Sequence, residues 1–181
     1  ISLAVYEAAH VFATGGRPER LGQAHRGSSP YQAFQTADGW ITVGAGQQNF
    51  WERLCDILEA PELATDARFR TNADRVRNND ALVDLLQQRL ILRPSQHWLD
   101  AMDGAAIPCG PILHCEEVLA DPHVLARDMV VETDHPTAGK FRTLGVPVKM
   151  SETPGAVYRP APRLGEHTAE VLAAVGMAEP A

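Results

Sequence analysis

The residues best placed to contact a ligand are small ones that flank a short β-prone segment. Glycine and serine let a ligand approach the backbone closely, and they also let a loop move. Before the segment come Gly22, Gly27, Ser28 and Ser29, and after it come Gly44 and Gly46. Turn chemistry explains most such residues, so they could equally be connectors. Both interpretations stay open from the residues alone.

The histidines and cysteines do not have the spacing of metal ligands. The sequence contains seven histidines and three cysteines, but no H-x-x-x-H or C-x-x-C pair. A G-x-S-x-G nucleophile elbow is also absent from the sequence. The run from Gly44 begins like a dinucleotide-binding loop but lacks the third glycine. These patterns argue against a metal enzyme, a hydrolase of the elbow type and a dinucleotide site.

The aspartates need no catalytic explanation. Asp38 lies at the tip of a predicted turn, where its side chain serves turn chemistry. The others are interpreted as helix caps or surface charge, and they are Asp66, Asp74, Asp121 and Asp134. The residues alone therefore give none of these aspartates a catalytic role.

The composition is that of an ordinary globular protein. The net charge of −7 argues against nucleic acid as a partner, because phosphates require a basic face. No apolar run approaches the roughly 20 residues that span a bilayer, and no signal-peptide pattern opens the chain. Three cysteines do not suggest a disulfide framework, and they fit the cytoplasm. Since the chain begins with Ile1 rather than Met, we expect it to be a fragment.

Hydrophobic periodicity predicts an α+β fold, in which antiparallel hairpins are mixed with several helices. The expected helices cover 1–14, 50–58, about 79–90, 95–104 and 166–175, with short helical turns in 61–79 and after Glu116. The expected hairpins cover 31–43 and 129–144, and extended segments cover 17–30, 106–113 and 151–163.

Several local predictions follow from residue types. Gly39 is expected to take a positive φ in the first hairpin turn. Asn78 or Asn79 is expected to cap one helix and Ser95 the next. Two prolines exclude a central strand in 106–113, and 146–150 could be an edge strand.

Three motifs, in this order, resemble those of family III CoA-transferases, the family of formyl-CoA and carnitine CoA-transferases. The motifs are S-P-Y-x-x-F-x-T-x-D-G-W-I from Ser29, A-I-P-C-G-P-I from Ala106, and R-L-G-E-H-T-A-E-V-L from Arg163. The resemblance covers essentially all 181 residues and implies the C-terminal half of such an enzyme.

In that family an aspartate attacks an acyl-CoA, and CoA passes to a carboxylic acid through anhydride and thioester intermediates. The resemblance implies that this aspartate lies in an N-terminal, Rossmann-like half outside the chain, so the isolated chain would be inactive. It implies no permanently bound cofactor, since coenzyme A thioester is the substrate. Most CoA phosphate contacts should lie elsewhere, because this chain is acidic.

The resemblance also implies a mobile loop that closes over the acyl intermediates and excludes water. It matches the segment Ala24 to Ser29, which gives the predicted substrate-binding residues His25, Arg26, Gly27, Ser28 and Ser29. Formyl-CoA transferases carry a run of glycines here, whereas this loop has only Gly27, which implies another acyl group. Arg26 could meet an acceptor carboxylate or could be a solvated loop charge.

The resemblance further implies three parts and a homodimer that is interlocked in the intact protein. Residues 1–30 would lead from the large domain, 31–135 would form a small α+β domain, and 136–181 would return to the large domain. Apolar side chains of the first and last helices should then lack full cover, among them Leu3, Val11, Val171 and Leu172. Two alternatives stay open: an acyl-CoA racemase of the same family, and a non-catalytic interaction module.

Overall fold

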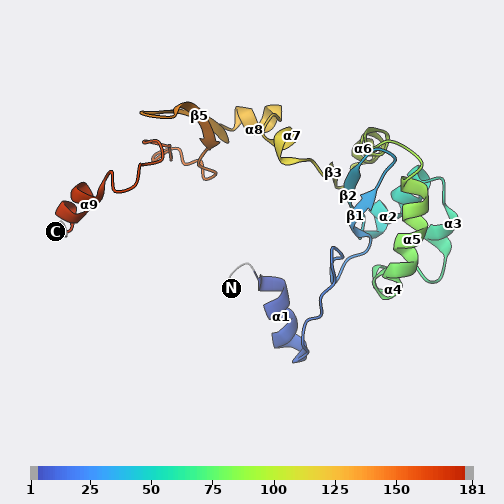
Figure 1. Cartoon of the computed structure of the whole chain (residues 1–181). Helices are drawn as coiled ribbons and strands as arrows, with labels where there is room; N and C mark the ends of the chain where they lie inside the picture. The colour runs from blue at the N-terminus through green and yellow to red at the C-terminus, as the bar shows by residue number, and fades with distance from the viewer. Residues whose placement is uncertain (1–3, 178–181) are drawn as a thin grey trace. The chain divides into compact units, whose positions relative to one another are not determined.

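The computed structural model describes residues 4–177. A three-stranded antiparallel sheet with the order β1-β2-β3 follows the candidate loop. β1 (Tyr31–Gln35) and β2 (Trp40–Gly44) form the predicted hairpin, and β3 (Cys109–Pro111) pairs with β2. Figure 1 shows β1 and β2 side by side. Phe34 lies opposite Ile41, and both are fully buried on the core face. β3 is an edge strand, which agrees with the exclusion of a central one.

The turn of this hairpin corrects the prediction for Gly39, which does not have a positive φ. The Thr36 amide donates to the Gly39 carbonyl at 2.9 Å, and the Gly39 amide donates to Thr36 Oγ1 at 3.1 Å. These bonds close a four-residue turn that needs no left-handed residue. A Cβ at Gly39 would lie 3.3 Å from Ser95 Oγ, so close packing favours glycine there.

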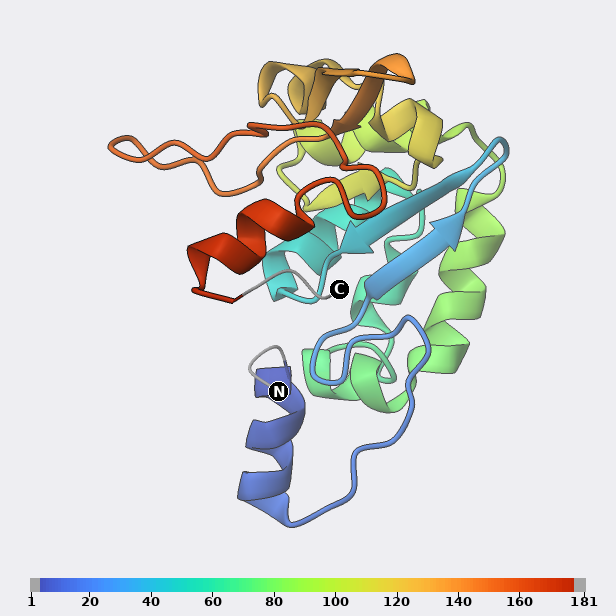
Figure 2. The same cartoon turned by 60° about the vertical axis from the view of Figure 1, so that its left-hand side comes forward.

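Five helices follow the hairpin within residues 48–104: α2 (Gln48–Ile57), α3 (Glu62–Thr65), α4 (Asn72–Arg77), α5 (Asn79–Leu90) and α6 (Ser95–Gly104). Of these, α5 and α6 pack directly on the sheet, α2 packs on α6, α3 on α2 and α4 on α5. The predicted stripe of Leu82, Leu86 and Leu90 is fully buried. Figure 2 shows α5 (green) running beside the hairpin. The helical periodicity therefore identified the side that packs.

Two predicted helix caps act differently in the structure. Asn78 stands at the N-cap of α5, but its side chain donates to the carbonyls of Arg68 and Asp74. Ser95 is the first residue of α6 rather than its cap. Asp38 accepts from the Ser95 amide at 2.7 Å, so the hairpin turn caps α6 from outside the helix.

α1 (Val5–Thr14) ends at Gly15, whose φ of 68° and amide bond to the Val11 carbonyl form the predicted glycine cap. None of its residues is buried, and Val11 is 39% exposed. The uncovered apolar face predicted for this helix is confirmed there, while Leu3 lies outside the described residues.

The chain forms two compact units, Ile1–Ile112 and Leu113–Ala181. The predicted domain limits after residues 30 and 135 stay predictions. The second unit contains α7 (Cys115–Val118), α8 (Pro122–Ala126), the predicted hairpin β4 (Val130–His135) with β5 (Gly139–Leu144), and α9 (Thr168–Ala174). α9 has no buried residue, and Val171 is 58% exposed, as expected.

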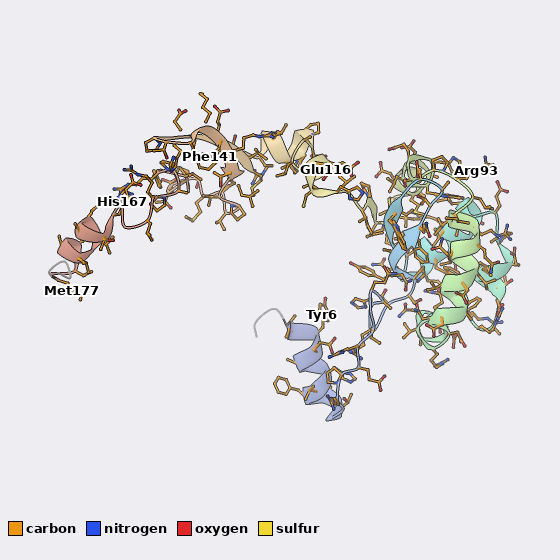
Figure 3. All side chains as sticks on the ribbon, in the orientation of Figure 1. Tyr6, Arg93, Glu116, Phe141, His167 and Met177 are labelled. Atoms are coloured by element: carbon orange, nitrogen blue, oxygen red, sulfur yellow. The ribbon has the colours of Figure 1, made fainter. Side chains whose placement is uncertain are left out.

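The segment 146–150 is not a strand, contrary to prediction. The β4–β5 ladder ends at Leu144, and the Gly145 amide donates back to the Met129 carbonyl at 3.0 Å. Pro147 brings no amide that could extend the ladder. Figure 3 shows side chains crowded among α2, α5 and α6, whereas neither α1 nor α9 has a buried residue.

Candidate functional site

The predicted loop residues His25 to Ser29 lie next to the start of α4 and α5. The structure brings them together with two asparagines and one arginine that come 43 or more residues later in the chain. These three residues hold the end of the loop that leads into β1.

The side-chain amide of Asn72 binds the loop on both sides of Ser28. Its Nδ2 donates to the Gly27 carbonyl at 2.8 Å, and its Oδ1 accepts from the Ser29 amide at 3.1 Å. A primary amide offers one donor group and one acceptor, so a single side chain satisfies both backbone groups. We call this pair of bonds the Asn72 bracket.

Ser29 is 1% exposed, and its polar groups are occupied by protein. Its hydroxyl donates to Asn79 Oδ1 at 2.8 Å, and its carbonyl accepts from Arg75 Nε at 2.7 Å. These contacts make Ser29 an anchor of the loop. Its predicted part in substrate binding stays a prediction.

Arg75 is fully buried, and no carboxylate pairs with it among residues 4–177. Its guanidinium also donates to the carbonyls of Gly46 at 2.8 Å and Phe69 at 3.0 Å. Burial lowers the pKa of Arg75, and the Trp51 ring centroid lies 5.1 Å from its Cζ. Carbonyl dipoles and a ring face thus replace a counter-ion, and one side chain joins the two glycine-containing segments.

Gly46 must be glycine because Ser28 occupies the space beside it. A Cβ at Gly46 would overlap the Ser28 hydroxyl and lie 3.4 Å from Asn72 Oδ1. The two small-residue segments, far apart on either side of the hairpin, therefore pack against each other.

Arg26 is held differently, by an ion pair on the surface. Its Nη2 donates to Glu7 Oε2 at 2.9 Å and its Nε to Glu7 Oε1 at 3.3 Å. The two side chains are 26% and 46% exposed. Such exposed pairs contribute about 0–1 kcal/mol, so a substrate carboxylate can compete with Glu7 for this guanidinium.

His25 is exposed and lies between two aromatic rings. Its ring centroid is 5.8 Å from that of Tyr6 and 5.1 Å from that of Tyr31. The Gly27 amide donates to His25 Nδ1 at 3.1 Å, which assigns the ring proton to Nε2 in the neutral form.

Two hollows border this loop. One, of about 620 Å³, is lined by Arg20, Arg26 and Arg77 together with the start of α5. The other, of about 510 Å³, lies between the loop and α1 and contains Tyr6, Glu7 and His25. The three arginines make the first hollow the more favourable of the two for an anionic group, because the second also contains Glu19.

The cysteines are poor nucleophiles where they are buried. Burial raises the pKa of Cys55 to about 12, and burial also raises the pKa of Cys109. Within the described part of the chain, no three His, Cys, Asp or Glu side chains gather as metal ligands would. None of the helices in residues 4–177 has the length and the apolar character that a membrane span requires.

Sequence reasoning missed Asn72, Arg75 and Asn79, which it left in a polar stretch or treated as caps. A usable signal was present: Thr71 and Asp74 have capping-box spacing, and both halves of that box form. A helix starting there places Asn72 and Arg75, three residues apart, on one face. The sequence could not identify the loop that these side chains bind, because that loop lies far from them along the chain.

Comparison with known proteins places these residues in a family. A family model described as CoA-transferase family III matches residues 1–168. Human succinyl-CoA:glutarate CoA-transferase is 40% identical over 154 residues, which are 85% of this chain and 35% of the relative. Acetyl-CoA:oxalate CoA-transferase of Acetobacter aceti is 39% identical over 158 residues, 87% of this chain and 39% of the relative.

A solved structure has the same fold. The crystal structure of a CAIB/BAIF family protein from Brucella suis matches with a TM-score of 0.74 and 31% identity, over 96% of this chain and 45% of that one. The chain thus spans less than half the length of these relatives.

Proposed function

Because this chain belongs to CoA-transferase family III, we propose that it is one part of an enzyme that moves CoA from an acyl-CoA to a carboxylic acid. The family match over residues 1–168 carries this proposal. Since the chain spans about 35% of the human relative, the activity would belong to a longer protein. That protein would be a cytoplasmic homodimer.

In this proposal the nucleophile is an aspartate outside the 181 residues. Its carboxylate bonds to the acyl carbon and CoA leaves as the thiolate, which splits one difficult exchange into easier steps. The loop from His25 to Ser29 closes over the resulting anhydride and keeps water away. In support, the loop is pinned at Ser29 by buried bonds and held at Arg26 by an exposed ion pair.

We propose a short dicarboxylic acid as the substrate class. The names of the relatives from human and Acetobacter aceti contain glutarate and oxalate, which are both short dicarboxylic acids. Arg26 supplies a planar pair of donors that suits a second carboxylate, which a monocarboxylic acid lacks.

The test is CoA transfer by the full-length protein from succinyl-CoA to acetate, oxalate, succinate and glutarate. New acyl-CoA is measured by liquid chromatography with mass spectrometry. Deuterated succinate is used as the succinate acceptor, so that succinyl-CoA formed by transfer differs in mass from the donor. We expect transfer to glutarate and succinate to exceed transfer to acetate by about tenfold or more, the value of one charge-assisted contact. The 181-residue chain by itself should transfer none.

Three outcomes would overturn the proposal. Transfer by the 181-residue chain would mean that it contains a nucleophile. Epimerisation of a 2-methylacyl-CoA without transfer would assign the racemase reaction. Neither reaction in the full-length protein would favour an interaction module.

A further inference from the structure

The two ends of the loop from His25 to Ser29 are held with unequal strength. At one end Ser29 is buried and bonded to Asn72, Arg75 and Asn79. At the other end Arg26 bonds to an exposed carboxylate on α1 and to the Glu19 carbonyl. Buried bonds are costly to break, whereas an exposed ion pair exchanges readily with water. The geometry therefore places a fixed pivot at Ser29.

The Asn72 bracket is the one contact that reaches past this pivot to Gly27 in the part of the chain that the structure describes. It bonds the residues on either side of Ser28, whose own amide and hydroxyl make no hydrogen bond within residues 4–177. Ser28 is thereby held in one orientation while its donors stay available to a ligand.

We propose that Asn72 is a positioning residue for the closing loop, and that it presents Ser28 to an oxygen of the acyl group. This inference rests on the proposed function. Asn72 itself touches no substrate: it acts through Gly27 and Ser29. Without the bracket, Gly27 and Ser28 move about the Ser29 pivot, and the closed loop lets water in.

The consequence is a side reaction that can be measured. Water oxygen bonds to the acyl carbon of the anhydride, the bond to the aspartyl oxygen breaks, and that oxygen keeps the electron pair. One water proton goes to solvent, and the products are the free acid, free CoA and the restored aspartate. The ratio of this hydrolysis to transfer reports how well the loop excludes water.

The first variant is Asn72→Ala in the full-length protein. We expect kcat for transfer to fall by about tenfold to a hundredfold, the effect of a group misplaced by about 1 Å. The ratio of hydrolysis to transfer should rise by about tenfold, while KM for acyl-CoA changes little. Asn72→Asp keeps the acceptor for the Ser29 amide and should recover part of the loss.

The matched control is Thr71→Ala. Thr71 caps the same helix by accepting from the Asp74 amide at 3.1 Å, and it makes no bond to the loop. Loss of the Thr71 cap should lower Tm about as much as Asn72→Ala does. It should leave the ratio of hydrolysis to transfer at the wild-type value. An equal rise in hydrolysis in this control would overturn the positioning role, because weakening of α4 would then explain both variants.

Hydrogen exchange separates this inference from the proposed function. In Asn72→Ala the Ser29 amide should exchange about fivefold to tenfold faster, the expected effect of one lost hydrogen bond. If the Ser29 amide exchanges at the wild-type rate in Asn72→Ala, the positioning role of the Asn72 bracket is rejected, even when the enzyme is active. Faster exchange in a protein that transfers no CoA would keep the bracket and reject the proposed function.

Discussion

Ser28 and Gly46 are packed so closely that one more carbon atom does not fit between them. A Cβ at Gly46 would overlap the Ser28 hydroxyl and lie 3.1 Å from Ser28 Cβ. The surrounding side chains cannot yield easily, because Asn72 holds the backbone on both sides of Ser28. The identity of residue 46 is thus decided by a residue that lies 18 positions earlier.

We predict that Gly46→Ala lowers the free energy of unfolding by about 1–3 kcal/mol, as overpacking does. Ser28→Gly in the same chain should recover most of this loss, because it removes both colliding atoms. Urea unfolding measures the change. Gly104→Ala is the control, since a Cβ there meets nothing within 4 Å. A Gly46→Ala protein as stable as wild type would contradict the close packing.

At the scale of elements, one carboxylate joins the hairpin turn to α6. Asp38 accepts from the Ser95 amide at 2.7 Å and from its hydroxyl at 3.0 Å. These bonds from Ser95, led by the one from its backbone amide, hold the pKa of Asp38 below its ordinary value of 3.8. A helix N-terminus favours a negative charge for the same reason.

The lowered pKa of Asp38 determines how its contribution to stability changes with pH. The folded protein binds a proton at Asp38 less readily than the unfolded chain, so Asp38 stabilises the fold fully above pH 3.8. This contribution is lost as the pH falls through the lower folded pKa. We predict that Asp38→Ala lowers Tm at pH 7 and that its difference from wild type shrinks below about pH 3.8.

Thermal unfolding at a series of pH values measures this difference. Asp84→Ala is the charge-matched control, because the Asp84 side chain is exposed and makes no hydrogen bond or ion pair within residues 4–177. Its Tm should stay near wild type throughout. A constant gap between Asp38→Ala and wild type down to pH 2 would contradict a charged cap.

For the whole molecule, the decisive feature is where the core lies. Every member of the buried apolar cluster falls between Phe34 and Ile107, inside the first unit. The described residues of the second unit contribute none to it. Burial of apolar area is the main favourable term in folding, so the first unit contains the means to fold by itself.

We predict that residues 1–112 unfold cooperatively, with a Tm within about 5 °C of that of the 181-residue chain. Near-ultraviolet circular dichroism of the buried Trp51 and Trp98 measures this transition. Residues 113–181 contain no tryptophan, and by themselves they should show no cooperative transition in far-ultraviolet circular dichroism. Loss of the transition in residues 1–112 would mean that the second unit stabilises the core.

Much of the fold was predictable because local pattern and burial agree. The leucine stripe of α5, the glycine cap of α1 and both hairpins are confirmed, as is the family resemblance drawn from three motifs. The errors fall where a residue's partner is distant. Gly39, Ser95 and Asn78 were assigned local roles, whereas each bonds or packs with another element.

The sequence by itself determined the α+β class, most of the elements and the family, since these depend on periodicity, turn residues and motif order. It also singled out the loop from His25 to Ser29. Only the tertiary structure decided how that loop is held, by Asn72, Arg75 and Asn79 at one end and Glu7 at the other. A hydrogen bond depends on distance and direction in space. The local pattern around Asn72 therefore does not identify its partner Gly27, which lies 45 positions away in the sequence.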